Sequence, residues 1–321
     1  MNSQDIWDAS QASSAVTECG GPTKVEAVHL ITILYKSERS LPTFLDSLQA
    51  QDLKGWRLHV IDNASPDSSL RIVTERGDPR ITVISNEKNL GFAKAANQGM
   101  RAAIAAGGEF LVLINNDTVF SPDFLRRLVA VRSGLPAGVI APRVMYREQP
   151  DKSWYAGGSL DNGWLFTNVH HEYSATNSSA AVEVDFAPGC CLGMSQEVLR
   201  KIGLLDESFF VYWEDVDFSL RLTKAGIKIF YVPEPFLLHS GGESSGGERS
   251  PAYMRLYYRS YMQVLRKHFG LRRAIGTMVR LLLVERNRKK RNLRVISIMA
   301  RAMVLGLSAP MVPQVGLDEN G

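Results

Sequence analysis

Carboxylate and amide side chains at several places in the sequence could bind a metal ion, hold a nucleotide or move a proton. The first group is Asn115-Asn116-Asp117, which follows an apolar run. Hard divalent cations prefer carboxylate and carbonyl oxygens, and Mg²⁺ usually takes one or two carboxylates plus substrate phosphates. Asp117 would be the metal-binding carboxylate and Asn115 a weaker oxygen ligand. The alternative is an Asx turn that leads into the following helix.

Two further polar residues stand where apolar runs end. Asp62 ends one run, and a carboxylate there can accept a hydrogen bond from a ribose hydroxyl or a base N–H. A helix cap formed by Ser65 or Asp67 is the alternative for this stretch. His239 ends another run, ahead of the Gly- and Ser-rich residues 240–247. A lone histidine is usually structural, but one at this position could ligate a metal.

Three carboxylates lie together in the segment Trp213-Glu214-Asp215-Val216-Asp217. If the segment is helical, Glu214 and Asp217 share one face and Asp215 points elsewhere. Acidic residues in the first turn stabilise a helix N-terminus, which is the structural alternative. A carboxylate beside aromatic residues also suits a general base in a partly dry pocket.

The elements that would position these residues alternate regularly. Strands are predicted at residues 28–35, 58–61, 81–85 and 110–114, and helices at 41–51, 68–76, 89–106 and 122–131. Ser121 is the predicted N-cap of the last helix, with Pro122 as its first residue. Four consecutive β-α units predict an α/β fold, with a mostly parallel sheet covered by helices. Ligands bind beyond the carboxyl ends of such strands, so the polar residues after them should converge on one edge.

The composition is that of an ordinary globular protein of 321 residues, with 45% hydrophobic and 22% charged residues. Short antiparallel strands and loops are predicted for residues 143–184. A helix is predicted at 196–202 and a strand at 227–232. The three cysteines form no C-x-x-C pair, and the polar residues 1–25 resemble neither a signal peptide nor an anchor. These features favour a cytoplasmic protein with a flexible N-terminal tail.

Positive charge is concentrated toward the C-terminal end. Residues 249–321 hold 15 Lys and Arg against 3 Asp and Glu, whereas residues 1–248 hold 22 against 30. Apolar stretches lie between these charges, so the segment predicts basic amphipathic helices that suit an anionic membrane surface. Nucleic acid is disfavoured, because the interleaved residues are aliphatic rather than aromatic. The remaining alternative is a solvated face of helices that pack on the body of the protein.

Taken together, the polar segments resemble the inverting family 2 glycosyltransferases of the GT-A fold, especially bacterial rhamnosyltransferase-like members. The matching segments are VIDNASPDS (60–68), NLGFAKAANQG (89–99), LINNDT (113–118), GCCLG (189–193) and FFVYWEDVDFSLR (209–221), together with His239. They occur in family order and cover about residues 28–260. A P-loop kinase and a dinucleotide dehydrogenase are disfavoured, because neither phosphate-binding glycine motif is present in its required context.

The resemblance implies a role for each matching residue. Asp215 would be the catalytic base of a single displacement that inverts the anomeric carbon. Asn115 and Asp117 would hold Mg²⁺ or Mn²⁺ against the diphosphate, with His239 as a further ligand. Acceptor binding would involve Trp213 and Glu214. Nucleotide binding would involve Asp62, which would hold the pyrimidine, and Tyr35, Asn63, Asn89, Gly91, Lys94 and Asn116.

The resemblance also implies a domain organisation and partners. A GT-A domain would span residues 26–248, with a nucleotide-binding half at 26–120 and an acceptor half at 121–248, before the basic helical segment 249–321. The donor would be dTDP-rhamnose or a UDP-hexose, and the acceptor a glycan or lipid-linked saccharide. Transfer would serve cell-surface polysaccharide or lipopolysaccharide synthesis at the inner face of the cytoplasmic membrane, with no nucleic-acid partner.

Two other functions remain open from the sequence. A sugar-phosphate nucleotidyltransferase would need a Gly-rich basic loop after the first strand, and residues 34–41 contain no glycine. A non-catalytic sugar-nucleotide-binding protein would not need to retain all four of the candidate site residues Asp62, Asp117, Asp215 and His239.

Overall fold

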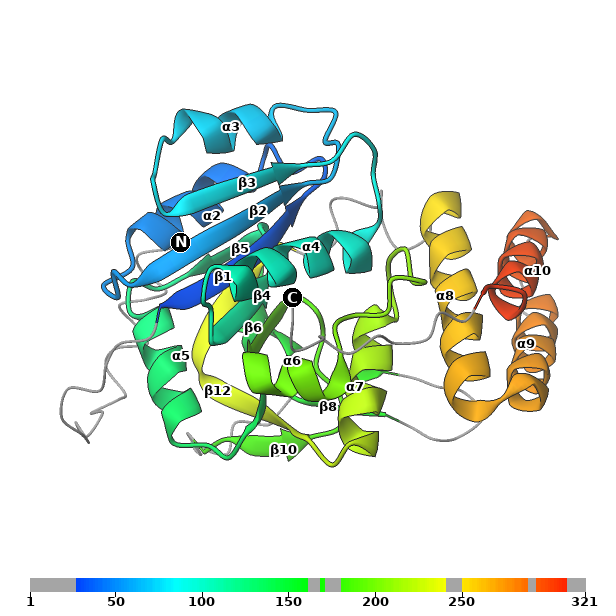
Figure 1. The fold of residues 1–321 in the computed structure, drawn as a ribbon. Coiled ribbons are helices and arrows are strands. Elements are labelled where there is room, and N and C mark those ends of the chain that lie inside the picture. The colour runs from blue at the N-terminus through cyan, green and yellow to red at the C-terminus, as the bar shows by residue number, and fades with distance from the viewer. Residues whose placement is uncertain (1–26, 161–167, 171–179, 241–249, 288–292, 311–321) are drawn as a thin grey trace.

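The computed structural model describes residues 27–160, 168–170, 180–240, 250–287 and 293–310. The predicted tail at residues 1–25 lies outside this part of the chain. A large mixed sheet is flanked by helices, and further helices follow toward the C-terminal end (Figure 1). The predicted α/β fold and the helical C-terminal segment are both confirmed.

The first half of the chain forms parallel strands in the order β4-β1-β2-β3. These strands are β1 (Val28–Leu34), β2 (Trp56–Asp62), β3 (Ile81–Ser85) and β4 (Phe110–Ile114), and helices α2 (Leu41–Gln49), α3 (Ser69–Glu75) and α4 (Phe92–Ala105) connect them. The apolar runs of β1 and β4 are almost entirely buried, as expected for strands covered on both faces. Parallel strands end at the same edge, so Asp62 and Asn115 come to one side of the sheet.

Helix α5 (Phe124–Ser133) corrects the predicted cap. Asp123, rather than Ser121, is the N-cap residue, and the helix begins two residues later than predicted. The hydroxyl of Ser121 instead donates to Asp123 Oδ1 at 2.6 Å. Asp123, two residues after Ser121, thus occupies the N-cap position that the Ser-Pro pattern predicted for Ser121.

The second half of the chain extends the sheet with mostly antiparallel pairings. Strand β11 (Cys191–Ser195) lies between β4 and β6 (Gly138–Tyr146), and β12 (Lys228–His239) follows beside β6. The short strands are β5 (Thr118–Phe120), β7 (Ser153–Tyr155), β8 (Gly158–Leu160), β9 (Asn168–His170) and β10 (Val182–Val184). Strand β12 runs beyond the predicted residue 232, because pairing resumes after an irregularity between Val232 and Phe236. Its last residue, His239, pairs with Thr118 of β5.

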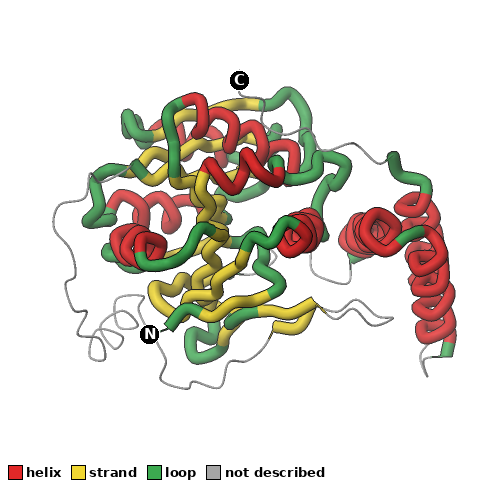
Figure 2. The backbone as a smooth tube through the Cα atoms, turned by 60° about the horizontal axis from the view of Figure 1, so that its bottom comes forward, coloured by secondary structure: helices red, strands yellow, loops and turns green. Residues whose placement is uncertain are grey.

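Helices dominate the end of the chain. Helix α6 (Gln196–Ile202) and α7 (Glu214–Lys224) precede β12, and α8 (Pro251–Phe269), α9 (Leu271–Arg286) and α10 (Leu293–Leu307) follow it. Figure 2 shows the last helices gathered at one end of the molecule, outside the layers that cover the sheet. A separate hydrophobic cluster joins α7 to these helices through Val216, Met262 and Met303. Among the described helices, none combines the length and the apolar character needed to cross a membrane.

Candidate active site

Asp117 and His239 meet at the edge of the sheet. Strand β5 pairs with β12 in a register that sets Thr118 opposite His239, and the backbone N–H of Ser240 donates to the carbonyl of Asp117 at 3.1 Å. The side chains follow this pairing, so His239 Nε2 lies 3.1 Å from Asp117 Oδ1. The structure thus brings together two predicted metal ligands that are far apart in the sequence.

The two atoms are in direct ion-pair contact, and this carboxylate and imidazole could together hold one cation in its place. The imidazole is held in place by Trp154, whose ring meets that of His239 edge-on at 4.8 Å between centroids. The described residues contain no group of three or more His, Cys, Asp and Glu side chains arranged to hold a metal. Mg²⁺ or Mn²⁺ at this pair would therefore also need water or substrate phosphates as ligands.

Electrostatics favour a positive charge at His239. Burial opposes a charged imidazole, but the neighbouring Cys190 and the carboxylate of Asp117 raise the pKa of His239. Burial raises the pKa of the Cys190 thiol, and the neighbouring His239 opposes this shift. A metal ion binds only the neutral imidazole, so a cation at this pair would have to displace the proton that its neighbours stabilise on His239.

The candidate base Asp215 is linked to the metal pair by a short segment before β11. Its Oδ2 accepts a hydrogen bond from the backbone N–H of Gly189 at 3.1 Å, and its Oδ1 accepts one from Val216 at 2.8 Å. The carbonyl of the next residue, Cys190, accepts from the backbone N–H of Asn115 at 2.9 Å. Gly189 thus contacts the candidate base Asp215, and the adjacent Cys190 contacts Asn115 in the segment that would bind the metal.

Burial raises the pKa of Asp215, whereas the hydrogen bonds from Gly189 and Val216 oppose this shift. A raised pKa brings a carboxylate closer to the range in which a general base works well near neutral pH. The adjacent Glu214 is buried, and burial together with the charge of Asp215 raises its pKa well above the usual range. Of the two acids, Asp215 is the more exposed.

The backbone before α7 is strained. Tyr212 and Trp213 have φ of +66° and +68°, a conformation that non-glycine residues rarely adopt and that costs about 1–3 kcal/mol each. The hydroxyl of Ser260 in α8 holds this loop by donating to the carbonyl of Val211 at 2.9 Å. Such strain is concentrated at functional sites, and here it fixes the direction from which Glu214 and Asp215 enter the helix.

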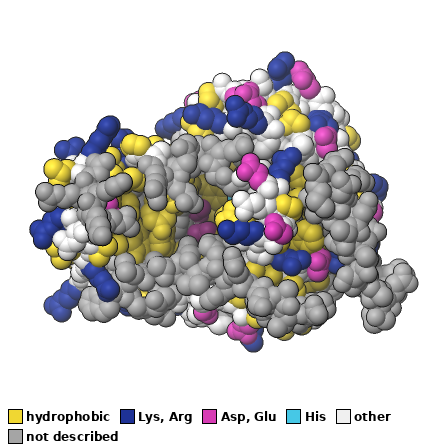
Figure 3. Space-filling view, turned by 180° about the vertical axis from the view of Figure 1, so that it is seen from behind, with side chains coloured by type: hydrophobic (Ala, Val, Ile, Leu, Met, Phe, Trp, Pro, Cys, Tyr) yellow, Lys and Arg dark blue, Asp and Glu magenta, His cyan; other side chains and the backbone are white. Residues whose placement is uncertain are grey.

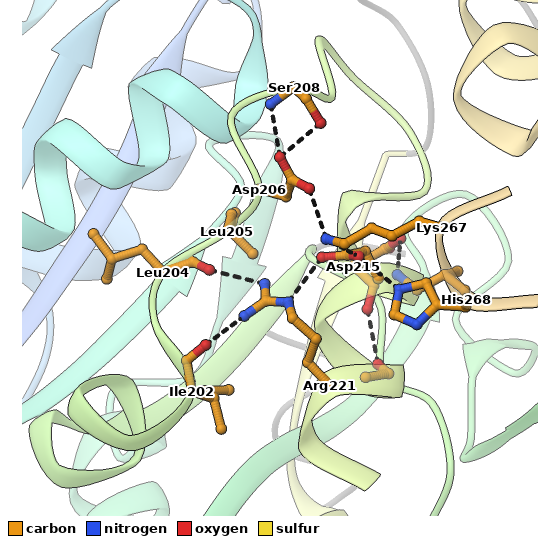
Figure 4. A network of polar contacts seen from close by, with 12 residues as sticks. Ile202, Leu204, Leu205, Asp206, Ser208, Asp215, Arg221, Lys267 and His268 are labelled. Carbon is orange, nitrogen blue, oxygen red and sulfur yellow. Dashed lines mark hydrogen bonds and ion pairs between the residues drawn. The ribbon is translucent and has the colours of Figure 1, made fainter. Parts of the chain in front are cut away.

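A buried ion-pair network ties α7 to α8. Asp217 is fully buried, and its Oδ1 lies 2.6 Å from Lys267 Nζ and 2.7 Å from His268 Nε2. Arg221 donates to Asp217 Oδ2 at 2.9 Å and also to the carbonyls of Ile202 and Leu204. Figure 4 shows Lys267 paired with Asp206, and Arg221 bonded to the carbonyls of Ile202 and Leu204. The acidic segment therefore divides, with Asp217 serving the packing of α7 and Asp215 pointing elsewhere, as the helical spacing predicts.

The candidate pyrimidine contact Asp62 ends β2. It is only 4% exposed, its Oδ1 accepts from the backbone N–H of Ser65 at 3.2 Å, and burial raises its pKa. The loops after β1 and β2 are joined, because the N–H of Lys36 donates to Ser65 Oγ at 2.8 Å. Ser65 donates to Asp67 within this loop, and Asp67 Oδ1 accepts from the backbone N–H of Ser69, the first residue of α3, at 3.1 Å.

Asn63 holds the loop after β3 together. Its Oδ1 accepts from the N–H of Leu90 at 2.9 Å, and its Nδ2 donates to Asn89 Oδ1 at 2.9 Å and to the carbonyl of Gly91. Gly91 has φ of +87°, and a side chain there would collide with the carbonyl of Phe210. This close approach joins the start of α4 to the loop before α7.

The remaining predicted nucleotide residues differ in exposure. Tyr35 is partly exposed directly after β1, and Lys94 is exposed on the first turn of α4. Asn116 is 8% exposed, and its Nδ2 donates to the carbonyl of Ile33 at 2.6 Å. Asn116 therefore bridges β1 and β4. Contact of these residues with a nucleotide stays a prediction.

Sequence reasoning missed two contributors to the site. Gly189 supplies the hydrogen bond to Asp215, and Trp154 packs on His239. Gly189 immediately precedes Cys190, and the pairing of β11 with β4 is what brings both beside Asn115. The Pro188-Gly189 pair indicated a turn before a strand. Local spacing could not show that this strand, β11, pairs with β4. Trp154 lay in the irregular middle region, where no periodicity indicated its position.

Comparisons with known proteins agree on one family. The model of "Glycosyl transferase family 2" matches residues 30–203. The chain is 25% identical over 276 residues to N-acetylglucosaminyl-diphospho-decaprenol L-rhamnosyltransferase of Mycobacterium tuberculosis, covering 78% of this chain and 87% of that protein. It is 23% identical over 263 residues to dTDP-rhamnosyl transferase RfbF of Shigella flexneri, covering 78% and 84%.

A solved structure agrees with the fold. GalNAc-T7, crystallised with UDP, GalNAc and Mn²⁺, superposes with a TM-score of 0.61 at 15% identity, covering 88% of this chain and 55% of that one. At this identity the likeness concerns the fold alone.

Proposed function

The chain belongs to glycosyl transferase family 2, and we therefore propose that it transfers L-rhamnose from dTDP-rhamnose, or a hexose from a UDP-sugar, to a glycan or lipid-linked saccharide. It is a glycosyltransferase of an inverting family. The nucleotidyltransferase and the non-catalytic binding protein are not favoured.

Two relatives support rhamnose as the first donor to test. The printed names of both the mycobacterial and the Shigella protein describe rhamnosyl transfer, and the former names a diphospho-decaprenol saccharide. Asp62 would accept a hydrogen bond from the N3–H that uracil and thymine share, so it gives no preference between UDP and dTDP. Both nucleotides therefore belong in the test.

The residues around Asp215 support a direct displacement. Asp215 would take the proton from the acceptor hydroxyl while the acceptor oxygen attacks the anomeric carbon and the nucleoside diphosphate leaves. The N–H groups of Gly189 and Val216 orient this carboxylate. Asp117 and His239 would hold Mg²⁺ or Mn²⁺, which when bound offsets charge on the leaving diphosphate.

The observation that carries the proposal is the 3.1 Å contact between Asp117 and His239, beside the segment that hydrogen-bonds Asp215. A site that must neutralise a diphosphate and deprotonate a hydroxyl needs both groups within one cleft.

We also propose that α9 lies on an anionic membrane. Leu271, Ile275, Val279 and Leu283 recur every four residues, share one face, and are each 41–51% exposed. The exposed Arg272 and Arg286 lie at the two ends of this face. An apolar stripe with flanking arginines matches the boundary between lipid tails and anionic head groups. Such a position would bring the enzyme to a lipid-linked acceptor at the inner face of the cytoplasmic membrane.

A ligand and transfer screen tests the donor. The thermal unfolding temperature is measured with Mn²⁺ and each of dTDP-rhamnose, UDP-hexoses and GDP-mannose, because a bound donor stabilises the folded state. Release of nucleoside diphosphate is then measured for each stabilising donor with a panel of octyl hexosides. Stabilisation and turnover with dTDP-rhamnose are expected, and turnover with GDP-mannose alone would contradict the proposal.

A further inference from the structure

An aromatic cluster runs from the loop before α7 onto α8. We call it the tyrosine ladder, and it consists of Tyr212, Trp213, Tyr253, Tyr257, Tyr258 and Tyr261. Tyr253 and Tyr257 are one turn apart on α8, with ring centroids 5.3 Å apart and planes 19° from parallel. Tyr212 packs on Tyr253 at 5.0 Å and Trp213 on Tyr257 at 5.3 Å. The contacts are therefore continuous between the two elements.

The tyrosine ladder has a buried part and a partly exposed part. Trp213 and Tyr261 are 3% and 4% exposed, and they stack at 4.5 Å inside the hydrophobic cluster of the C-terminal helices. Their role in packing α7 against α8 is evident. The other four residues are partly exposed, and three of them, Tyr212, Tyr253 and Tyr257, contact one another. Packing alone does not account for three such adjacent aromatic rings at the surface.

The exposed part lies close to the candidate base. Trp213, which contacts Tyr257, is two residues before Asp215. Burial raises the pKa of Tyr257, and the charge of Asp215 contributes in the same direction. From behind, Figure 3 shows the molecule hollowed between the C-terminal helices and the sheet domain, with hydrophobic and acidic side chains visible inside.

The position of α8 is fixed relative to Asp215. Lys267 and His268 bind Asp217 on α7, and Ser260 binds the carbonyl of Val211 in the preceding loop. Tyr253 and Tyr257 lie on the same helix as these anchors. Rings on a rigid element next to the base can hold a substrate hydroxyl at a defined place.

The chemistry of this surface fits a sugar ring. A pyranose presents C–H groups on its faces and hydroxyls at its edge, so an aromatic face can cover the ring while one hydroxyl points to a carboxylate. The family model ends at residue 203, so it does not include α8. Resting on the proposed function, we propose that Tyr212, Tyr253 and Tyr257 form the acceptor subsite, which packs against the saccharide ring whose hydroxyl Asp215 deprotonates.

The test compares acceptor and donor kinetics in single variants. Wild type is assayed with its best donor from the screen and a panel of octyl glycosides of N-acetylglucosamine, glucose, galactose, mannose and rhamnose. In Tyr257→Ala, KM for the glycoside that reacts best is expected to rise about tenfold, whereas donor KM stays within about twofold. Tyr257→Phe should restore acceptor KM, because the ring face and not the hydroxyl makes the contact.

Phe269→Ala is the matched control. Phe269 is also a partly buried aromatic residue of α8, but it lies at the far end of the helix and packs on Arg273. Its loss should lower stability without changing acceptor KM. An unchanged acceptor KM in Tyr257→Ala, with active wild type, would overturn the subsite alone. Failure of wild type to transfer to any glycoside of the panel would overturn the proposed function and the subsite with it.

Discussion

His239 Nε2 lies 3.1 Å from Asp117 Oδ1, at the point where the end of β12 meets the residues that follow β4. This contact depends on the pairing of β5 with β12, which is not local in sequence. The same edge carries Asp215 through the hydrogen bond from Gly189. Single substitutions can separate the roles of these groups from the packing that holds them.

Replacing the candidate base should stop transfer without loss of nucleotide binding. Asp215→Asn keeps the size of the side chain and an oxygen to accept from Gly189, but it cannot take a proton. We expect kcat to fall by about 10³-fold, the usual scale for a general base, with donor affinity unchanged. Product release and nucleotide titration measure the two quantities. The exposed Asp185→Asn serves as control, and near-normal turnover of Asp215→Asn would remove this residue from the base role.

Removing either candidate metal ligand should weaken the effect of Mn²⁺ on nucleotide binding. In wild type, EDTA should lower the affinity for UDP or dTDP, because the diphosphate then loses its counter-charge. Asp117→Asn and His239→Gln should each lower affinity about tenfold with Mn²⁺ present and respond weakly to EDTA. Because both side chains would ligate one ion, the losses in the double variant should not add. Titration calorimetry measures this, and additive losses would argue for separate roles.

The buried carboxylate of Asp217 should make stability depend on acid pH. Burial alone would raise its pKa, but His268, Arg221 and Lys267 more than offset this and hold the pKa well below its ordinary value of 3.8. Its contribution is therefore complete above about pH 4 and lost as pH falls below that value. Asp217→Asn should cost about 3–5 kcal/mol at pH 7, because Lys267 and Arg221 lose their buried partner.

Urea unfolding at pH 7 and pH 3 measures this difference, which should shrink at the lower pH. Arg71 and Glu75 provide the matched control, since they are also an i,i+4 pair but are both largely exposed. Glu75→Gln should change stability by no more than ~0.5 kcal/mol. If the difference in unfolding free energy between Asp217→Asn and wild type is the same at both pH values, the lowered pKa of Asp217 is contradicted.

Binding to anionic vesicles tests the proposed membrane face. Val279→Asp places a charge in the middle of the exposed apolar stripe and should abolish binding. Arg272→Ala should weaken binding about fivefold at low salt, since one basic residue near an anionic surface contributes ~1 kcal/mol. Co-sedimentation with phosphatidylglycerol vesicles measures both variants, with phosphatidylcholine vesicles as control. If wild-type protein does not bind anionic vesicles at low salt, the proposed membrane face of α9 is wrong.

Much of the first half of the fold could be predicted, because β1 to β4 and their helices are local units whose strands are continuous apolar runs. Helix α6 and strand β4 have the predicted bounds. The expectation that Asp117 and His239 meet was also correct. It came from the order of the family segments rather than from any spacing between them.

The parts that could not be predicted depend on pairing at long range. The end of β12 continues past two prolines because β6 and β5 supply partners on both sides. The network around Asp217 needs Lys267 and His268 from a helix that local patterns showed only as basic and amphipathic. The sequence predicted that Asn63 binds the nucleotide, and only the structure shows that its side-chain amide donates to Asn89 and to the carbonyl of Gly91.

The family match ends at Gly203, just after α6, whereas Asp215, His239 and α8 all follow this point. A gene fragment that ends at this boundary would encode Asp62 and Asp117 but not Asp215 or His239. A chimera joined to a relative at this junction would exchange the proposed base Asp215 and the tyrosines of α8 together, and would keep the proposed pyrimidine contact Asp62. The proposed base and the proposed acceptor tyrosines thus lie together in a contiguous part of the chain that the family match does not cover.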